Sequence, residues 1–338
     1  MATEFGLAEI EAASRRIAGR VIRTPVLSSP MLDELAKCRV FVKAESLQRT
    51  GSFKFRGALN KILAMDPEVR RRGIITYSAG NHGHAVAAAA REVGCPAVIV
   101  LPVTAPTIKV DNCRWWGAET VFYDPTSQDR EEVARAIAEP RGLELVPPFD
   151  DFEVMAGQGT AGLEFAEELV RLDACPDALL VCCSGGGLAS GAATAMKARF
   201  PDLACHVVEP AGLDKMARSL ACGFPQPKPS SPTTIMDGIA GPIAGARPLA
   251  VLRGLGATGL TVTDAEAQEA MAVAFRFLKL VLEPGGAAAL AAAITKGSSL
   301  AGKTVAVIGT GGNVDEDVFA DAVAGDARSS ARSSGDGS

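Results

Sequence analysis

Apolar and often β-branched runs alternate along the chain with stretches in which apolar residues recur at helical spacing. Short continuous apolar runs are typical of strands buried on both faces, as in parallel sheets covered by helices. The expected strands are VFVKAE and the runs at residues 73–79, 96–102, 119–124, 178–184, 205–210 and 304–310. The expected helices include residues 82–94, 127–139, 160–172 and 264–282. The pattern predicts an α/β protein whose mostly parallel sheets are flanked by helices.

Two segments interrupt this pattern. The Pro-rich segment PPFDDFE, near residues 147–153, indicates a crossing between two domains. From residue 325 onward the chain reads GDARSSARSSGDGS, which has too few apolar residues to join a core. We expect residues 325–338 to form a disordered tail.

Composition narrows the class of protein. The chain has 338 residues, 48% of them hydrophobic, so about two domains with a well-buried core are expected. A net charge of −5 and the lack of a long basic run argue against a nucleic-acid-binding surface. No apolar run approaches the ~18 residues of a membrane span, and the first residues do not resemble a signal peptide.

Cysteine usage indicates the compartment. The eight cysteines show no CxxC spacing, and several lie in strand-like runs such as ALLVCCS. Buried free thiols are therefore favoured over disulfides or a zinc site. Free thiols persist in a reducing environment, so we expect a cytoplasmic protein.

Four loops rich in glycine or small polar residues follow expected strands. They are SAGNHGH, SGGGLASG, EPAG and GTGGN. In open α/β sheets ligands bind at the carboxyl ends of the strands, so we expect these loops to surround one site.

The loop SGGGL contains Gly185, Gly186 and Gly187 and joins a buried strand to a helix. Glycines let backbone N–H groups approach an anion, and a helix N-terminus favours negative charge, so the loop is a candidate phosphate site. A tight turn that needs glycine only for packing is one alternative. A dinucleotide fingerprint is another, although the spacing G-x-G-x-x-x-G is one residue longer than G-x-G-x-x-G.

Lys54 stands between Phe53 and Phe55 at the start of an expected helix. Most lysines at such positions are exposed. An amine held among aromatic rings away from water has a lowered pKa, however, and can attack a carbonyl to form a Schiff base. A reactive lysine together with a phosphate site indicates pyridoxal phosphate as the cofactor.

Two further residues belong to the glycine-containing loops. Asn81 in SAGNHGH either donates a hydrogen bond to the phenolic oxygen of such a cofactor or serves only the geometry of the turn. Thr310 in GTGGN either fills the core or meets the ring nitrogen with its hydroxyl.

The motifs GSFKFRGA, SAGNHGHAVA, PFDDFEVMAGQGTAGLE, SGGGLASG, VEP, EPGGAAAL and GTGGN occur in this order. In this combination the chain resembles the fold-type II pyridoxal-phosphate enzymes (tryptophan synthase β-like), and within them the serine/threonine dehydratases and serine racemases. The resemblance implies a large cofactor-binding domain formed by residues 1–72 and 149–324 and a small mobile domain formed by residues 73–148. It also implies a homodimer.

The resemblance assigns roles to individual residues. Lys54 is the Schiff-base lysine and the base that removes the substrate's α-proton, and Thr310 lies opposite the ring nitrogen. The implied cofactor-binding residues are Phe53, Lys54, Asn81, Ser184, Gly185, Gly186, Gly187, Leu188, Gly238, Glu283 and Thr310. The implied substrate-binding residues, which hold the carboxylate, are Ser78, Ala79, Gly80, Asn81 and His82.

The implied reaction removes water from a β-hydroxy amino acid and gives a 2-oxo acid and ammonia. An L-serine/L-threonine ammonia-lyase comes first, a 3-hydroxyaspartate or other β-hydroxy amino acid dehydratase second, and serine racemase third. Racemisation comes last because Ala79 stands where serine racemase has a serine that returns the proton to Cα. Outside the family, a nicotinamide-dependent oxidoreductase or a non-catalytic amino-acid-binding protein would also explain the glycine loop.

Two positions concern metal binding and specificity. Relatives that bind a divalent cation (Mg²⁺, Mn²⁺ or Ca²⁺) use a glutamate at Glu209, a backbone carbonyl at Leu213 and an aspartate at the position of Lys215. An ammonium cannot ligate a cation, so a metal site is expected only if Asp214 takes that place. His84, where relatives often have glutamine, either caps the following helix or faces the substrate, where it would help to accept a β-carboxylate.

Overall fold

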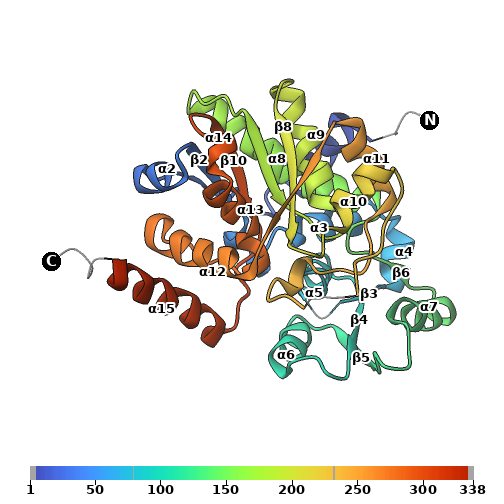
Figure 1. Cartoon of the computed structure of the whole chain (residues 1–338). Helices are drawn as coiled ribbons and strands as arrows, with labels where there is room; N and C mark the ends of the chain where they lie inside the picture. The colour runs from blue at the N-terminus through green and yellow to red at the C-terminus, as the bar shows by residue number, and fades with distance from the viewer. Residues whose placement is uncertain (1–4, 79, 231–232, 334–338) are drawn as a thin grey trace.

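The computed structural model describes residues 5–78, 80–230 and 233–333 of the chain. Ala79, one of the predicted substrate-binding residues, lies outside these ranges. Within them the strands form two separate sheets, one of six strands and one of four (Figure 1).

The large sheet has the strand order β1-β2-β10-β7-β8-β9. β1 pairs with β2 in antiparallel fashion, and all other neighbours are parallel. Its strands are β1 (Val26–Leu27), β2 (Arg39–Ala44), β7 (Ala178–Cys182), β8 (Ala204–Pro210), β9 (Thr258–Val262) and β10 (Thr304–Gly309). Because β2 pairs with β10, an early strand and the last strand of the chain are neighbours in the same sheet.

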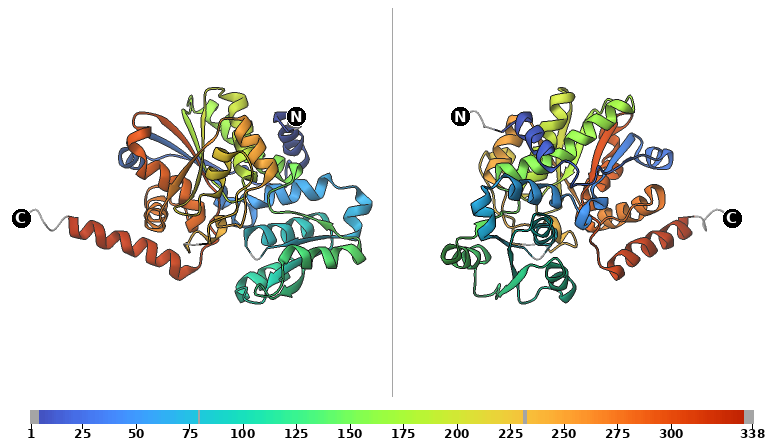
Figure 2. Two further views of the ribbon diagram at one scale, coloured as in Figure 1. Left: turned by 45° about the vertical axis from the view of Figure 1, so that its right-hand side comes forward. Right: turned by 180° about the vertical axis from the view of Figure 1, so that it is seen from behind.

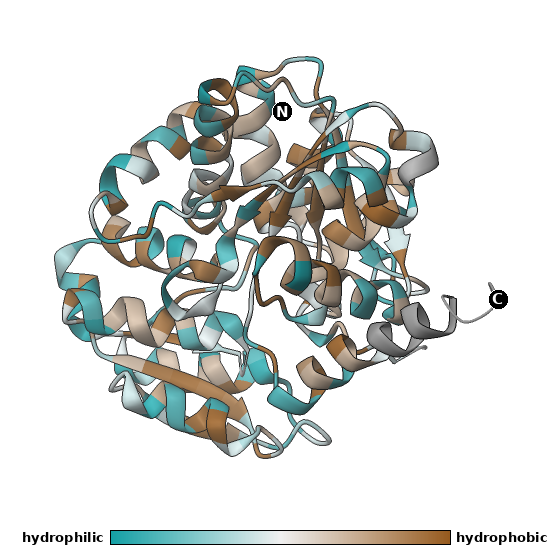
Figure 3. Cartoon of the chain, turned by 90° about the vertical axis from the view of Figure 1, so that its left-hand side faces the viewer, coloured by the Kyte–Doolittle hydropathy of each residue, from teal (hydrophilic) through white to brown (hydrophobic). Residues whose placement is uncertain are grey.

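Alternate residues of the central strands face opposite sides of the large sheet. On one side Val42 and Leu180 pack against α12 and α13, and on the other Phe41 and Leu179 pack against α8 and α9. Figure 3 shows these strands mostly as hydrophobic, as expected for a sheet covered on both faces. The covering helices are α8 (Phe152–Arg171), α9 (Gly187–Arg199), α12 (Asp264–Val273) and α13 (Pro284–Thr295).

The small sheet is entirely parallel, with the order β5-β4-β3-β6, and lies to one side of the large sheet (Figure 2). α5 and α6 cover one of its faces, and α7 covers the other. Its elements are β3 (Ile74–Tyr77), α5 (Asn81–Val93), β4 (Ala97–Pro102), α6 (Thr107–Trp115), β5 (Glu119–Tyr123), α7 (Arg130–Arg141) and β6 (Glu144–Leu145).

The helix α3 (Lys54–Ala64) contacts both parts of the molecule. Its Phe55 and Leu59 belong to the core that α5 forms with the small sheet. On its other side it packs closely along α8, where a Cβ on Gly157 would lie 2.6 Å from the Cα of Gly57. The predicted division into a small domain at residues 73–148 therefore stays a prediction, because α3 shares the small sheet's core.

The remaining elements surround the sheets. They are α1 (Leu7–Ile17), α2 (Pro30–Ala36), η1 (Glu45–Leu47), η2 (Arg49–Gly51), α4 (Pro67–Arg72), α10 (Lys215–Cys222), η3 (Asp237–Ile239), α11 (Ala246–Gly254), η4 (Ala274–Leu278), α14 (Gly297–Leu300) and α15 (Glu316–Ser333). The η elements are 3-10 helices except η4, which is a π-helix.

The predicted α/β class is confirmed, and each of the seven expected strands is present. Three further strands were not expected from the sequence. β1 and β6 are two residues long, and β9 has partly exposed residues at the sheet edge, so none gives a continuous apolar run.

The expected disordered tail at residues 325–338 stays a prediction. α15 continues through residue 333, and Figure 2 shows it extending away from the sheets. Residues 325–333 belong to this helix although few of them are apolar. Residues 334–338 lie outside the described ranges.

All eight cysteines are unpaired and six of them are buried, as the sequence predicts. In the part of the chain that the structure describes, every helix is too short or too polar to cross a membrane.

Candidate active site

A cavity of about 480 Å³ lies at the carboxyl ends of β7 and β10, next to the N-terminus of α5. This is the edge at which the sequence predicts a ligand site. The predicted residues that line it are Phe53, Lys54, Ser78, Gly80, Asn81, His82, Ser184, Gly185, Gly186, Gly187, Leu188, Gly238, Glu283 and Thr310. Glu209 does not line it, and the individual roles of the lining residues remain proposals.

Lys54 is placed by the junction of α3 with β10. The Phe53 N–H donates to the Thr310 carbonyl at 3.1 Å, which holds the start of α3 against the end of the strand. The Lys54 Nζ donates to the Pro148 carbonyl at 2.7 Å, and the side chain is accessible only in part, where it lines the cavity. Burial lowers the pKa of Lys54 to about 8. A substantial fraction of this amine is therefore neutral near physiological pH.

The triglycine loop is shaped by its neighbours. A Cβ on Gly185 would lie 2.2 Å from the Phe149 ring, and one on Gly186 would lie 2.6 Å from Met216 Cε. Gly186 also has a φ of +95°, which other residues rarely adopt. Packing therefore requires these glycines, as the first alternative supposed, but the loop also opens α9. The first helical bond runs from Ser190 N to Gly186 O, so the amides between them have no partner in α9 and suit an anion.

Thr310 and Cys182 meet at the ends of β10 and β7. The Thr310 hydroxyl and the Cys182 thiol lie 3.2 Å apart, and both residues line the cavity. Burial raises the pKa of Cys182 to about 12, so the thiol stays protonated. The pair offers a neutral partner to a ring nitrogen. Sequence reasoning did not identify Cys182, although its place at a strand end two residues before the loop was a signal.

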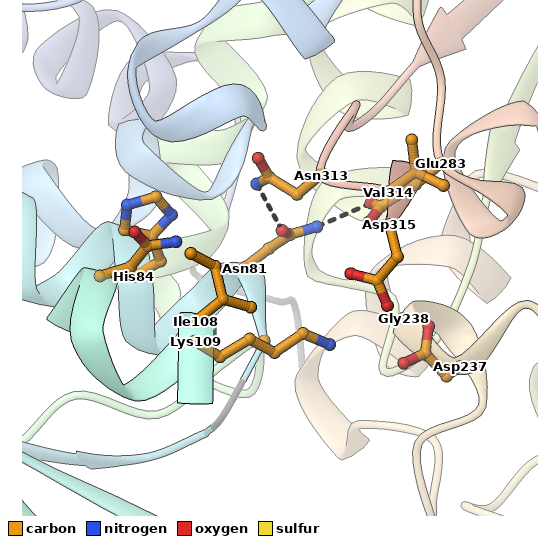
Figure 4. A pocket seen from close by; sticks show the side chains of 12 residues that line it. Asn81, His84, Ile108, Lys109, Asp237, Gly238, Glu283, Asn313, Val314 and Asp315 are labelled. Carbon is orange, nitrogen blue, oxygen red and sulfur yellow. Dashed lines mark hydrogen bonds between the residues drawn. The ribbon is translucent and has the colours of Figure 1, made fainter. Parts of the chain in front are cut away.

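Asn81, Glu283 and Asn313 form a hydrogen-bonded chain (Figure 4). The Asn81 Nδ2 donates to Glu283 Oε1 at 2.7 Å, and Asn313 Nδ2 donates to Asn81 Oδ1 at 2.8 Å. Burial raises the pKa of Glu283 to about 7, and the Asn81 hydrogen bond opposes that rise. The predicted bond from Asn81 to a cofactor hydroxyl remains a proposal, because its amide group donates to Glu283 here. Asn313 was not predicted, although it ends the motif GTGGN.

His82 is almost fully buried. Its Nε2 lies 3.0 Å from the Val146 carbonyl, so Nε2 carries the proton, and Nδ1 has no hydrogen-bond partner within the described residues. Burial, followed by the charge of Lys54, lowers the pKa of His82 to about 3. The ring is neutral, and its free nitrogen is an acceptor. The His82 side chain therefore cannot donate a hydrogen bond to the substrate carboxylate. The predicted contact of His82 with that carboxylate would have to use its backbone N–H.

Basic residues of α6 and α7 line the cavity from the small-sheet side, and sequence reasoning did not identify them. They are Lys109 of α6 and Arg130 of α7. The Arg130 guanidinium lies 5.5 Å from the centre of the Tyr77 ring. An adjoining cavity of about 210 Å³ is lined by Lys109, His84 and Asp237 (Figure 4). His84 thus faces a cavity, and its ring centre lies 6.2 Å from that of Trp116. It does not cap α5, which begins at Asn81 without a side-chain cap.

The residues around Glu209 do not fit a divalent cation. The Glu209 carboxylate accepts hydrogen bonds from the backbone N–H of Met216 and Ala217 and from the Lys215 Nζ. The Leu213 carbonyl accepts the Lys215 backbone N–H at 2.9 Å. Among the described residues, no group of three His, Cys, Asp or Glu side chains is placed to hold a metal. A ligand role for Asp214 stays a prediction.

Comparison with known proteins gives consistent matches. Residues 17–311 match the family described as "Pyridoxal-phosphate dependent enzyme". The chain is 41% identical to an L-threo-3-hydroxyaspartate ammonia-lyase of Pseudomonas sp, over 93% of this chain and 97% of the relative. It is 40% identical to a serine racemase of Oryza sativa subsp. indica, over 90% of each. Its fold is similar to that of a threonine deaminase from T.th., with a TM-score of 0.87 and 42% identity over 92% of this chain and 99% of the other.

Proposed function

Because the chain belongs to the fold-type II pyridoxal-phosphate-dependent enzymes of the serine/threonine dehydratase and serine racemase group, we propose that it is an ammonia-lyase acting on a β-hydroxy amino acid. Membership confirms the family that the sequence motifs predict, and with it the cofactor, pyridoxal 5'-phosphate. A nicotinamide-dependent oxidoreductase, which the glycine loop alone left open, has no support.

One observation carries this proposal. A half-buried lysine amine with a lowered pKa lines the same cavity as a triglycine loop that opens a helix. The amine suits a carbonyl and the loop suits a phosphate, so the residues present fit the cofactor. When bound, the cofactor supplies a carbonyl carbon that holds the substrate's amino group and a ring that withdraws electrons from Cα.

The side chains of this protein divide the remaining work. The neutral amine of Lys54 takes the proton from Cα, and the Pro148 carbonyl, 2.7 Å away, then accepts a hydrogen bond from the ammonium. The backbone N–H groups near Gly80 and Asn81 hold the substrate carboxylate. The Thr310 hydroxyl leaves the ring nitrogen without an added proton, which favours rapid loss of the β-hydroxyl. Loss of the α-proton and the β-hydroxyl as water gives an enamine, which hydrolyses to a 2-oxo acid and ammonia.

Two substrate classes compete. L-Serine and L-threonine come first, because of the resemblance to the serine/threonine dehydratases and to a threonine deaminase. The second candidate is 3-hydroxyaspartate, which Lys109 and Arg130 favour because both cationic side chains line the cavity and would attract a second carboxylate. Serine racemase comes third because Ala79 carries no exchangeable proton.

A substrate panel tests the proposal. The purified holoenzyme is incubated with isomers of serine, threonine, 3-hydroxyaspartate and phenylserine, and 2-oxo acid and ammonia are measured. We expect equal amounts of both products from at least one β-hydroxy amino acid. Lys54→Ala should lose the yellow colour and the activity. Lys61→Ala, on the same helix and paired with Asp151, should keep both. Product formation by Lys54→Ala at the wild-type rate would contradict the proposal.

We also propose that the protein is a cytoplasmic homodimer, as its family resemblance implies. Light scattering after size-exclusion chromatography should give about twice the chain mass of 34.9 kDa. A mass equal to that of one chain would contradict the dimer.

A further inference from the structure

A lysine and a glutamate are both fully buried at the end of β8, outside the cavity. Lys215 and Glu209 have no exposed side-chain surface, and the Lys215 Nζ lies 3.3 Å from Glu209 Oε1. The ammonium also donates to the Ile239 carbonyl at 3.1 Å. The carboxylate accepts the backbone N–H of Met216 at 3.0 Å and of Ala217 at 2.9 Å. Buried charges are retained only where they are paired and hydrogen-bonded, and this pair meets that condition.

By the family resemblance, the ammonium stands where metal-binding relatives supply an aspartate ligand. It brings one positive charge to Glu209, and no water or free ligand is needed to hold it. The Leu213 carbonyl, the other expected ligand, already accepts a backbone hydrogen bond from Lys215. A divalent cation at Glu209 would therefore have to displace a tethered cation.

The pair also connects three segments around the triglycine loop. Ile239 ends η3, whose Asp237 and Gly238 line the cavity. Met216, the residue after Lys215, lies directly against Gly186, because a Cβ there would approach its methyl group to 2.6 Å. Beyond η3, the Gly241 N–H donates to the Ser184 hydroxyl at 3.2 Å. The segments that border the loop thus meet at one ammonium group.

We propose that Lys215 is a built-in cation that replaces the divalent metal of relatives and positions η3 and α10 against the triglycine loop. The holoenzyme then neither binds nor needs a divalent cation at Glu209. Lys215 touches neither substrate nor cofactor, so it acts through Ile239, Glu209 and Met216 as a positioning residue.

The wild-type holoenzyme tests the first part. After dialysis against EDTA, the Tm is measured with and without added MgCl₂, CaCl₂ or MnCl₂, and bound Mn²⁺ is measured by electron paramagnetic resonance. We expect no bound Mn²⁺ that depends on Glu209 and a change in Tm below about 1 °C, because a ligand stabilises only a protein that binds it. One equivalent of Mn²⁺ that is lost in Glu209→Gln would overturn the proposal.

Lys215→Asp tests the replacement directly. Two buried carboxylates repel each other, so in EDTA this variant should have a lower Tm and bind pyridoxal phosphate about tenfold more weakly than the wild type. Mn²⁺ should bind to this variant and restore much of its Tm and of its affinity for pyridoxal phosphate. Lys197→Ala is the matched control, since Lys197 also donates to a backbone carbonyl, that of Leu203, but lies away from the loop. The Tm and the cofactor affinity of Lys197→Ala should equal those of the wild type, both with and without Mn²⁺. Lack of Mn²⁺ binding by folded Lys215→Asp, or binding without recovery, would refute the replacement.

A double variant keeps the positioning role testable if Lys215→Asp does not fold. Glu209→Gln with Lys215→Met keeps similar volumes and leaves no unpaired charge, so the protein should fold. Without the ammonium, the Ile239 carbonyl loses its donor, and the dissociation constant of the cofactor should rise about tenfold, with no response to Mn²⁺. Wild-type cofactor affinity in this variant would mean that the pair does not position the loop.

Discussion

Lys54 owes its chemistry to the groups around it. Its two neighbours in sequence have different surroundings. Phe55 is buried in the core between α3 and α5, whereas the centre of the Phe53 ring lies 5.2 Å from the Lys54 Nζ. The Pro148 carbonyl is the hydrogen-bond acceptor that the sequence could not indicate, because it lies 94 residues away. Burial lowers the pKa of Lys54 to about 8, so the reactive neutral form is populated near physiological pH.

This pKa predicts how the cofactor-free protein captures pyridoxal phosphate. Only the neutral amine attacks the carbonyl, so the capture rate should rise with pH and level off above a midpoint near 8, whereas an ordinary lysine titrates near ~10.4. Stopped-flow absorbance across pH 6 to about 10 measures the rate. A rate that still rises steeply above about pH 9 would contradict the lowered pKa.

A second residue-scale prediction concerns Gly186. Gly186→Ala adds a methyl group against Met216 and forces a side chain into positive φ, so the triglycine loop must shift. We expect cofactor affinity to fall at least about tenfold, as for a displaced supporting residue, measured by equilibrium binding. Gly254→Ala is the control, because a Cβ there meets nothing within 4 Å. Equal cofactor affinity in both variants would show that the loop tolerates the shift.

At the scale of elements, α3 is anchored by buried charges close to Lys54 at its start. Arg56 has no exposed side-chain surface and forms ion pairs with Glu45 at 2.7 Å and Glu164 at 2.8 Å. Lys43 on β2 pairs with Glu164 at 2.7 Å. These pairs join β2, α3 and α8. They hold the helix that carries the reactive lysine against the large sheet. The same ion pairs therefore stabilise the fold and position Lys54.

Arg56→Ala should therefore be strongly destabilising. It leaves the fully buried Glu45 without its ion-pair partner and, among the described residues, with only the Thr24 hydroxyl as a side-chain donor. Breaking a buried ion pair typically costs about 3–5 kcal/mol. Urea denaturation measures the free energy of unfolding. Arg171→Ala is the matched control, because its pair with Glu168 is largely exposed and should contribute at most about 1 kcal/mol. A loss for Arg56→Ala no larger than that of the control would contradict the anchoring role.

At the scale of the whole molecule, the site lies between the two sheets. Asn81 begins α5 beside the small sheet, whereas Glu283 and Asn313 belong to segments next to the large one, and their hydrogen bonds span the gap (Figure 4). Side chains from both sides line the cavity. Movement of the small sheet relative to the large one would therefore open or close the site.

The expected closure predicts a change in hydrogen–deuterium exchange. On binding a substrate or a non-reactive amino acid, amides near Asn81 and in α6 should gain protection, because a closed lid excludes water. Amides of α8, within the large-sheet core, serve as the internal reference and should not change. Unchanged protection at the cleft in the presence of saturating ligand would count against a lid.

Features that depend on adjacent residues could be predicted from the sequence, whereas features that depend on long-range packing could not. The seven main strands follow from continuous apolar runs, whereas β9 was missed because its pattern is only partly buried at a sheet edge. Lys54, Asn81, the glycines and Thr310 were found because each belongs to a motif of adjacent residues. Lys109 and Arg130 were not found, because packing alone brings them to the cavity. Cys182 and Asn313 were overlooked although each lies in or beside a motif, because only packing shows that Cys182 meets Thr310 and Asn313 meets Asn81.

The order of motifs along the chain determined the family, the α/β fold and the cofactor, because each depends on short stretches whose chemistry is complete in themselves. Tertiary structure alone decided that the Pro148 carbonyl meets the reactive amine and that the charge at position 215 is buried on Glu209. Such contacts join residues whose spacing in sequence carries no periodic signal. They arise only when separate helices and strands pack together and exclude water.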